Sequence, residues 1–203
     1  YFMGILFFIS GFFVVKSYDK KGAKKFLLDR FKRLGIPTLI YMWIIHPFTI
    51  YFIMGSTWER PSFWAYYTYY IGSLDFVGSS GPLWFAFALL IFNIIYCVIR
   101  CVTKNKPVSS QKALLDWKAA IKMSLGIAVC AFLIRLVQPI DTSIINMQLC
   151  FFSQYVILFI WGVKWGRYEW FSKLSYESSK KYLFAGIVGG SLIWAVLMVA
   201  GGA

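Results

Sequence analysis

The segment from Phe7 to Pro37 limits the possible folds of this chain more than any other. An apolar run ends at residue 15 and is followed by eight lysines and arginines between Lys16 and Arg33, with only two aspartates among them. A second apolar run then begins. Two nearly uncharged stretches on either side of a dense basic segment are typical of two membrane spans joined by a cytoplasmic hairpin.

The same alternation of apolar and basic segments continues along the sequence. The stretches expected to span a membrane are residues 1–15, 36–54, 83–102, 119–136, 147–163 and 182–203. A helix needs about 20 apolar residues to cross a bilayer, and these stretches lack the period-two alternation of membrane strands. We therefore predict an all-α fold, a polytopic transmembrane helix bundle of about six spans, in one membrane-embedded domain over residues 1–203.

The composition supports a membrane location. With 60% hydrophobic and 14% charged residues, the chain is too apolar for a soluble domain, in which about 25% of residues are charged. Its net charge of +13 would suggest a nucleic-acid partner in a soluble protein. Here the charges lie in short loops between apolar stretches, so the expected partner is the lipid bilayer and not nucleic acid.

The basic residues are distributed unevenly among the loops. Nineteen of the 21 lysines and arginines fall in alternate loops, at residues 16–33, 100–122 and 164–181. Only Arg60 and Arg135 remain for the other side. By the positive-inside rule, the basic loops are expected to be cytoplasmic in a multi-pass protein of the cell membrane.

Four motifs follow one another along the chain: FFISGFF at residues 7–13, FLLDRFKRLGIP at 26–37, GPLWFAFALLIF at 81–92 and QYVILFIWGVKWGRYEWFSKL at 154–174. In order and spacing they resemble acyltransferase family 3, multi-pass membrane enzymes that O-acylate sugars and other acceptors. The resemblance extends from Phe7 to about Leu174. It implies transfer of an acyl group from acyl-CoA, a co-substrate and not a permanently bound cofactor, to a hydroxyl of a glycan or similar acceptor.

The resemblance also implies where the general base lies. In this family the histidine expected to act as the base belongs to the span before the FFISGFF motif. The chain begins inside one apolar run and ends inside another, so we expect a fragment that lacks the first span and the C-terminal spans. A polytopic transporter or flippase is the alternative function, because an aromatic-rich bundle with few charges in its spans suits both classes.

The basic segment contains the residues expected to bind the donor, which are Arg30, Arg33 and Lys25. Phe26, Arg30 and Arg33 recur at helical spacing, which predicts a short interfacial helix with both arginines on one face. The resemblance suggests that they clamp the phosphates of acyl-CoA, since a guanidinium binds phosphate through two hydrogen bonds. Contact with lipid headgroups explains the same residues equally well.

His46 is the single histidine and precedes Pro47 near the middle of an expected span. An ionisable residue at this depth is a candidate functional residue, and an imidazole is the commonest general base. The alternative is a neutral imidazole that hydrogen-bonds between packed helices, with a carbonyl group freed by the proline as its partner. The resemblance does not transfer the role of the base to His46.

The residues expected on the acceptor side are Trp64, Tyr67, Trp84, Gln148 and Gln154. The aromatic run that contains Trp64 and Tyr67 could stack on sugar rings, but Trp and Tyr also gather at membrane interfaces without a ligand. Trp84 either shapes the site or anchors its helix at the interface. The two glutamines either line an acceptor cavity or hydrogen-bond between helices.

Two glycines and two cysteines are the small residues that the sequence singles out. Gly162 and Gly166 lie four residues apart, which permits close packing of two helices. Cys97 and Cys101 share a helix face and are expected to act as small hydrophobic side chains. No zinc motif accompanies the cysteines in the sequence, so no metal site is predicted.

Overall fold

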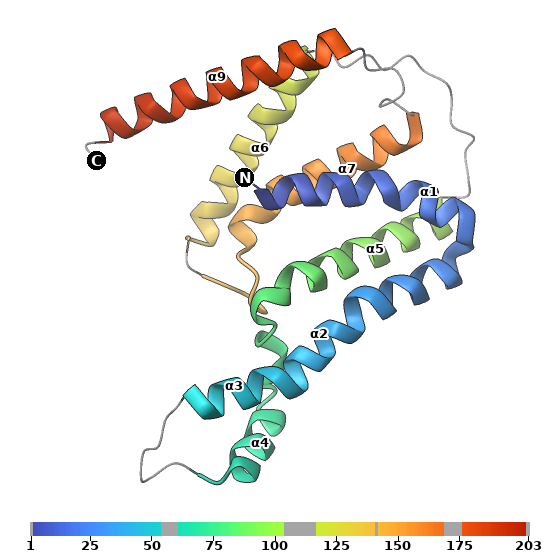
Figure 1. Ribbon diagram of the computed structural model, residues 1–203, viewed down its shortest axis with the longest axis vertical. Helices are drawn as coiled ribbons and strands as arrows, with labels where there is room; N and C mark the ends of the chain where they lie inside the picture. Colours follow the sequence, from blue (N-terminus) through green and yellow to red (C-terminus); the bar gives the residue numbers. More distant parts are fainter. Residues whose placement is uncertain (1, 54–60, 104–116, 141, 169–175, 202–203) are drawn as a thin grey trace. The chain divides into compact units, whose positions relative to one another are not determined.

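The computed structural model describes residues 2–53, 61–103, 117–140, 142–168 and 176–201 (Figure 1). These residues are almost all helical, and within them the only β-type pairing is an isolated bridge between Ile144 and Met147. The predicted all-α fold is confirmed. The chain divides into two compact units, Tyr1–Tyr168 and Glu169–Ala203, and each is described by itself.

Five helical stretches are long and apolar enough to cross a membrane. They are Met3–Ile53, Gly81–Val102, Lys118–Val137, Leu149–Tyr168 and Ser179–Ala200. The first has 51 residues, which is far more than the roughly 25 that one span needs. It contains residues 3–15 and 36–53 of the first two predicted spans. Within the described residues, each of the six predicted spans therefore lies mostly on a helix.

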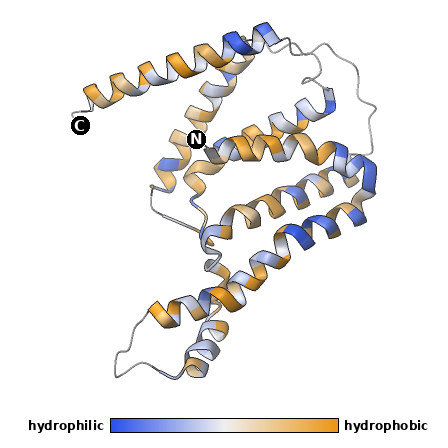
Figure 2. Ribbon diagram, in the orientation of Figure 1, coloured by the Kyte–Doolittle hydropathy of each residue, from blue (hydrophilic) through white to orange (hydrophobic). Residues whose placement is uncertain are grey.

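The first stretch is folded back on itself at one glycine. Within α1 (Phe2–Arg30), Gly22 has φ 73° and ψ 166°, a backbone conformation that is essentially restricted to glycine. The chain reverses direction there, and an ion pair between Lys21 and Asp29 links the residues on the two sides of the bend. Figure 2 shows hydrophilic residues gathered around this bend, as expected for a hairpin between two spans.

After the bend the chain stays helical as far as Ile53. Two π-helical turns, Phe31–Gly35 and Tyr41–Ile45, alternate with α2 (Ile36–Ile40) and α3 (His46–Ile53). The helix predicted over the basic segment is present, but it is not short. The basic segment after the bend is the first part of one long helix that continues into the second span.

The two π turns explain why the prolines do not break this helix. A proline has no N–H and its ring collides with the carbonyl group four residues earlier. Each π turn lies just before a proline, and the N–H groups of Ile36 and His46 donate to carbonyl groups five residues back. The wider turn makes room for Pro37 and Pro47 within the helix.

The core of the first unit lies between α1, α5 (Trp84–Val102) and α7 (Phe152–Tyr168). Phe7 is fully buried there. Its ring centroid lies 5.2 Å from that of Phe85, 5.0 Å from that of Phe92 and 4.6 Å from that of Tyr155. Aromatic pairs at these separations stabilise a core beyond their buried area.

Glycines allow α1 and α7 to touch through their backbones. A Cβ atom added to Gly11 would overlap the carbonyl oxygen of Phe159, and one added to Gly162 would overlap the carbonyl oxygen of Phe8. Gly166 faces the carbonyl oxygen of Phe12 in the same way. The close packing predicted from Gly162 and Gly166 is confirmed, since only glycine permits so short an approach.

The remaining helices are α4 (Phe63–Gly72), α6 (Trp117–Val137) and, in the second unit, α9 (Tyr176–Ala200). The Ser62 hydroxyl caps α4 by accepting a hydrogen bond from the N–H of Ala65 at 3.4 Å. Cys97 is buried, as expected for a small hydrophobic side chain, whereas Cys101 is exposed.

Candidate functional site

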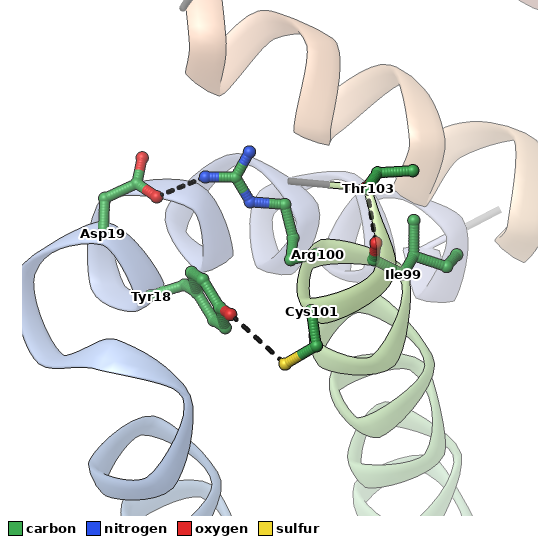
Figure 3. A network of polar contacts seen from close by, with 6 residues as sticks. All are labelled: Tyr18, Asp19, Ile99, Arg100, Cys101 and Thr103. Carbon is green, nitrogen blue, oxygen red and sulfur yellow. Dashed lines mark hydrogen bonds and ion pairs between the residues drawn. The ribbon is translucent and has the colours of Figure 1, made fainter. Parts of the chain in front are cut away.

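The bend of α1 meets the last turn of α5 in a polar network, which Figure 3 shows from close by. Arg100 donates a hydrogen bond from Nη2 to Oδ1 of Asp19 at 2.7 Å. The Tyr18 hydroxyl lies 3.6 Å from the Sγ atom of Cys101. These contacts join two helices at the end of the unit where the basic residues gather, which we call the basic end.

A layer of two rings between two arginines continues from this network. The guanidinium carbon of Arg100 lies 5.5 Å from the centre of the Tyr18 ring. The Tyr18 and Phe26 rings lie 5.6 Å apart, and the guanidinium carbon of Arg30 is 5.3 Å from the Phe26 ring. Cation–π contacts of this kind fix each guanidinium in place. The layer thus connects Arg30 to Arg100 across the bend.

The three residues predicted to bind the donor all lie at the basic end. Arg30 is partly buried against Phe26, whereas Arg33 and Lys25 are exposed. Burial, and then the charge of Arg33, lower the pKa of Arg30, but an arginine stays protonated at neutral pH. The hydrogen bond from Lys21 lowers the pKa of Asp29, so this carboxyl group is ionised and paired. The ring of Phe26 thus holds Arg30 beside two exposed cations, and cationic donors of this kind suit phosphate groups.

A pocket of about 520 Å³ lies at the opposite end of α5 and α7. Its lining residues are Gly81, Pro82, Trp84, Ser143, Asn146, Gln148, Phe151 and Tyr155. Asn146 donates from Nδ2 to the Gly81 carbonyl oxygen at 3.0 Å and to the Ser80 hydroxyl at 3.3 Å. These bonds tie the loop before α7 to the start of α5, and so fix the pocket's shape.

The pocket brings together only two of the five residues predicted on the acceptor side, Trp84 and Gln148. Trp64 is 71% exposed on α4. Its ring makes a T-shaped contact with that of Tyr67 in a separate aromatic cluster. Gln154 packs against α1, because a Cβ atom at Gly4 would overlap its Nε2 atom. Of the two glutamines, Gln148 therefore lines the pocket, whereas Gln154 packs between helices.

His46 does not line the pocket and lies beside an aromatic hydroxyl. The Tyr70 hydroxyl donates to the Met42 carbonyl oxygen at 2.8 Å and lies 3.3 Å from Nδ1 of His46. Because that hydroxyl has a single hydrogen, Nδ1 is assigned as the donor in the second contact. The Met42 carbonyl oxygen thus accepts from Tyr70 and not from His46. The contact between His46 and Tyr70 agrees with an imidazole that hydrogen-bonds between packed helices.

Asp19, Arg100 and Asn93 are among the polar residues that the sequence did not single out. Asp19 and Arg100 are distant in sequence and meet only because α1 and α5 pack together. Asn93 is fully buried in the middle of α5, and its Oδ1 atom has no hydrogen-bond partner among the described residues. An uncharged amide within an apolar run is the signal that could have pointed to Asn93.

The fold and the two polar ends define a class, a multi-pass helical membrane protein with a cationic surface at one end and a polar pocket at the other. Comparison with known families is more specific. A family model described as "Acyltransferase domain", that of acyltransferase family 3, matches residues 1–202. The chain belongs to this family and is a membrane acyltransferase. Comparisons with curated proteins and with solved structures give no match.

Proposed function

We propose that the chain moves an acyl group from acyl-CoA to a hydroxyl of a glycan or similar acceptor. In this proposal the basic end faces the cytoplasm and binds the donor phosphates through Arg30, Arg33 and Lys25. The polar pocket at the other end receives the acceptor. The acceptor oxygen attacks the thioester carbonyl, a general base takes its proton, and the thiolate of CoA leaves and is protonated.

One observation supports a glycan acceptor beyond what membership of the family implies. The pocket combines the aromatic ring of Trp84 with amide groups, from Asn146 and Gln148. Rings that stack on a sugar and amides that hydrogen-bond to its hydroxyls are the two groups that carbohydrate recognition needs. The basic end, where this proposal has the donor bind, lies at the other end of α5, which runs from Trp84 to Arg100 and beyond.

The acceptor site can be tested by replacing Trp84 with Ala in the full-length protein. We expect the kcat/KM for the acceptor to fall about fivefold, because one aromatic contact contributes roughly 1 kcal/mol. The KM for acyl-CoA should not change. Trp64→Ala is the matched control, since Trp64 is exposed and does not line the pocket. Equal effects of the two variants would remove the pocket from the proposal.

A further inference from the structure

A second hollow lies between α5 and α7, along the sides of the two helices. It is a groove of about 590 Å³. Its floor consists of the buried rings of Phe92, Tyr96 and Phe159. These residues belong neither to the basic end nor to the polar pocket, so the groove is a separate feature of the first unit.

The rims of the groove are apolar and exposed. Ile95 and Ile99 on α5 are 51% and 53% exposed, and Val156 and Ile160 on α7 are 40% and 47% exposed. In a helix that crosses a bilayer, exposed aliphatic side chains face the hydrocarbon of the lipids. The groove therefore opens towards the lipid phase.

Charge distinguishes one end of the groove from the rest. The charged side chains in its lining are Lys164 and Arg167, both cationic and both near the end of α7. The apolar lining of α7 runs from Phe152 to Val163, or about 17 Å at 1.5 Å per residue. That length matches one leaflet, which is half of a hydrocarbon core about 30 Å thick.

We propose that this groove binds one anionic phospholipid of the bilayer. Its acyl chain lies on the aromatic floor, and its headgroup phosphate contacts Lys164 and Arg167. Charge complementarity supports an anionic headgroup, because arginine binds phosphate through two hydrogen bonds and lysine adds a point charge. The position of both cations at the level where a headgroup must lie supports a bilayer lipid.

The test uses the full-length protein in nanodiscs of phosphatidylcholine. Phosphatidylglycerol with a diazirine in its acyl chain is the probe, and phosphatidylcholine with the same diazirine is the comparison. Crosslinked peptides are then identified by mass spectrometry. We expect peptides with Ile95 and Val156 to be labelled on the order of tenfold more by phosphatidylglycerol, since each cation contributes several-fold to anionic-lipid binding.

Three variants separate the effect of charge from that of shape. Lys164→Gln with Arg167→Gln should abolish the preference for phosphatidylglycerol, whereas Lys118→Gln with Lys122→Gln, on α6 and away from the groove, should keep it. Ile95→Trp, which fills the groove and keeps both cations, should lower labelling by both probes.

Three results would overturn the proposal. The first is equal labelling by the two lipids in the unchanged protein. The second is stronger displacement of the probe by palmitoyl-CoA than by an equal mole fraction of phosphatidylglycerol, which would assign the groove to the donor. The third is crosslinking through the groove between two copies of the chain.

Discussion

At the scale of single residues, the arginines of the basic end give the sharpest prediction. Replacing Arg30 and Arg33 with Lys keeps both charges and most of the attraction to lipid headgroups, but it removes the planar guanidinium groups. We expect the KM for acyl-CoA to rise about tenfold at equal expression, since loss of bidentate phosphate contacts costs roughly 1–2 kcal/mol. Lys20→Arg is the control. An unchanged KM would reduce Arg30 and Arg33 to lipid contacts.

Asn93 gives a second prediction at this scale. Its Nδ2 donates to the Leu89 carbonyl oxygen at 2.6 Å, while its buried Oδ1 has no partner within the described part of the chain. A buried acceptor without a partner costs roughly 1–3 kcal/mol. Asn93→Leu keeps the branched shape of the side chain and removes the unpaired acceptor, so it should raise the midpoint of thermal unfolding in detergent. A clear fall in that midpoint would show that the amide oxygen has a partner in the folded protein.

The same residues show what the sequence could reveal and what it could not. Lys25, Arg30 and Arg33 were predictable as a group because they are adjacent in a basic segment. The pair of Asp19 and Arg100 was not, because it depends on how α1 packs against α5. Local sequence patterns indicate which face of a helix is apolar and where charge gathers. A contact between residues distant in sequence follows only from tertiary packing.

At the scale of helices, the packing of α1 on α7 is the feature most open to test. Gly162→Ala places a methyl group against the Phe8 carbonyl oxygen and should destabilise the protein by about 1–3 kcal/mol, as overpacking does. Gly126→Ala is the matched control, because no atom lies within 4 Å of a Cβ atom there. The control should be neutral or stabilising, since alanine favours a helix more than glycine. Equal unfolding midpoints for the two variants would contradict the close approach.

The helices themselves were predictable because a span needs a long apolar stretch, and the described part of each predicted stretch lies mostly on a helix. Their continuity was not. A short helix was predicted for the basic segment before the second span, yet π turns carry one helix past both prolines, which usually break helices. A widened turn is a response of the backbone that residue types alone do not specify.

At the scale of the whole molecule, the orientation in the membrane is a prediction from charge. Cysteines placed at Lys20 and Thr142, on a background without the native cysteines, should react differently with an impermeant thiol reagent in intact cells. Only position 142 should be labelled, because the basic loops are expected to be cytoplasmic. Labelling at position 20 would reverse the orientation.

Four further positions follow the same prediction. Asn105 and Lys173 are expected inside the cell, and Ser56 and Asp141 outside it; all four lie outside the residues that the structure describes. Agreement among all positions would fix the basic end as the side on which acyl-CoA is available.

The central claim is acyl transfer from acyl-CoA to a hydroxyl acceptor, and it is tested most directly by following the acyl group itself. The full-length protein in nanodiscs is supplied with isotope-labelled acetyl-CoA and a polysaccharide acceptor. We predict release of CoA thiol together with an equal amount of label on the polysaccharide in an ester that hydroxylamine cleaves. Because His46 pairs with Tyr70, His46→Ala should lower the rate far less than the roughly 10²- to 10⁴-fold expected for loss of a general base. A well-folded protein that carries glycans across a bilayer but transfers no acyl group from any acyl-CoA would contradict the account.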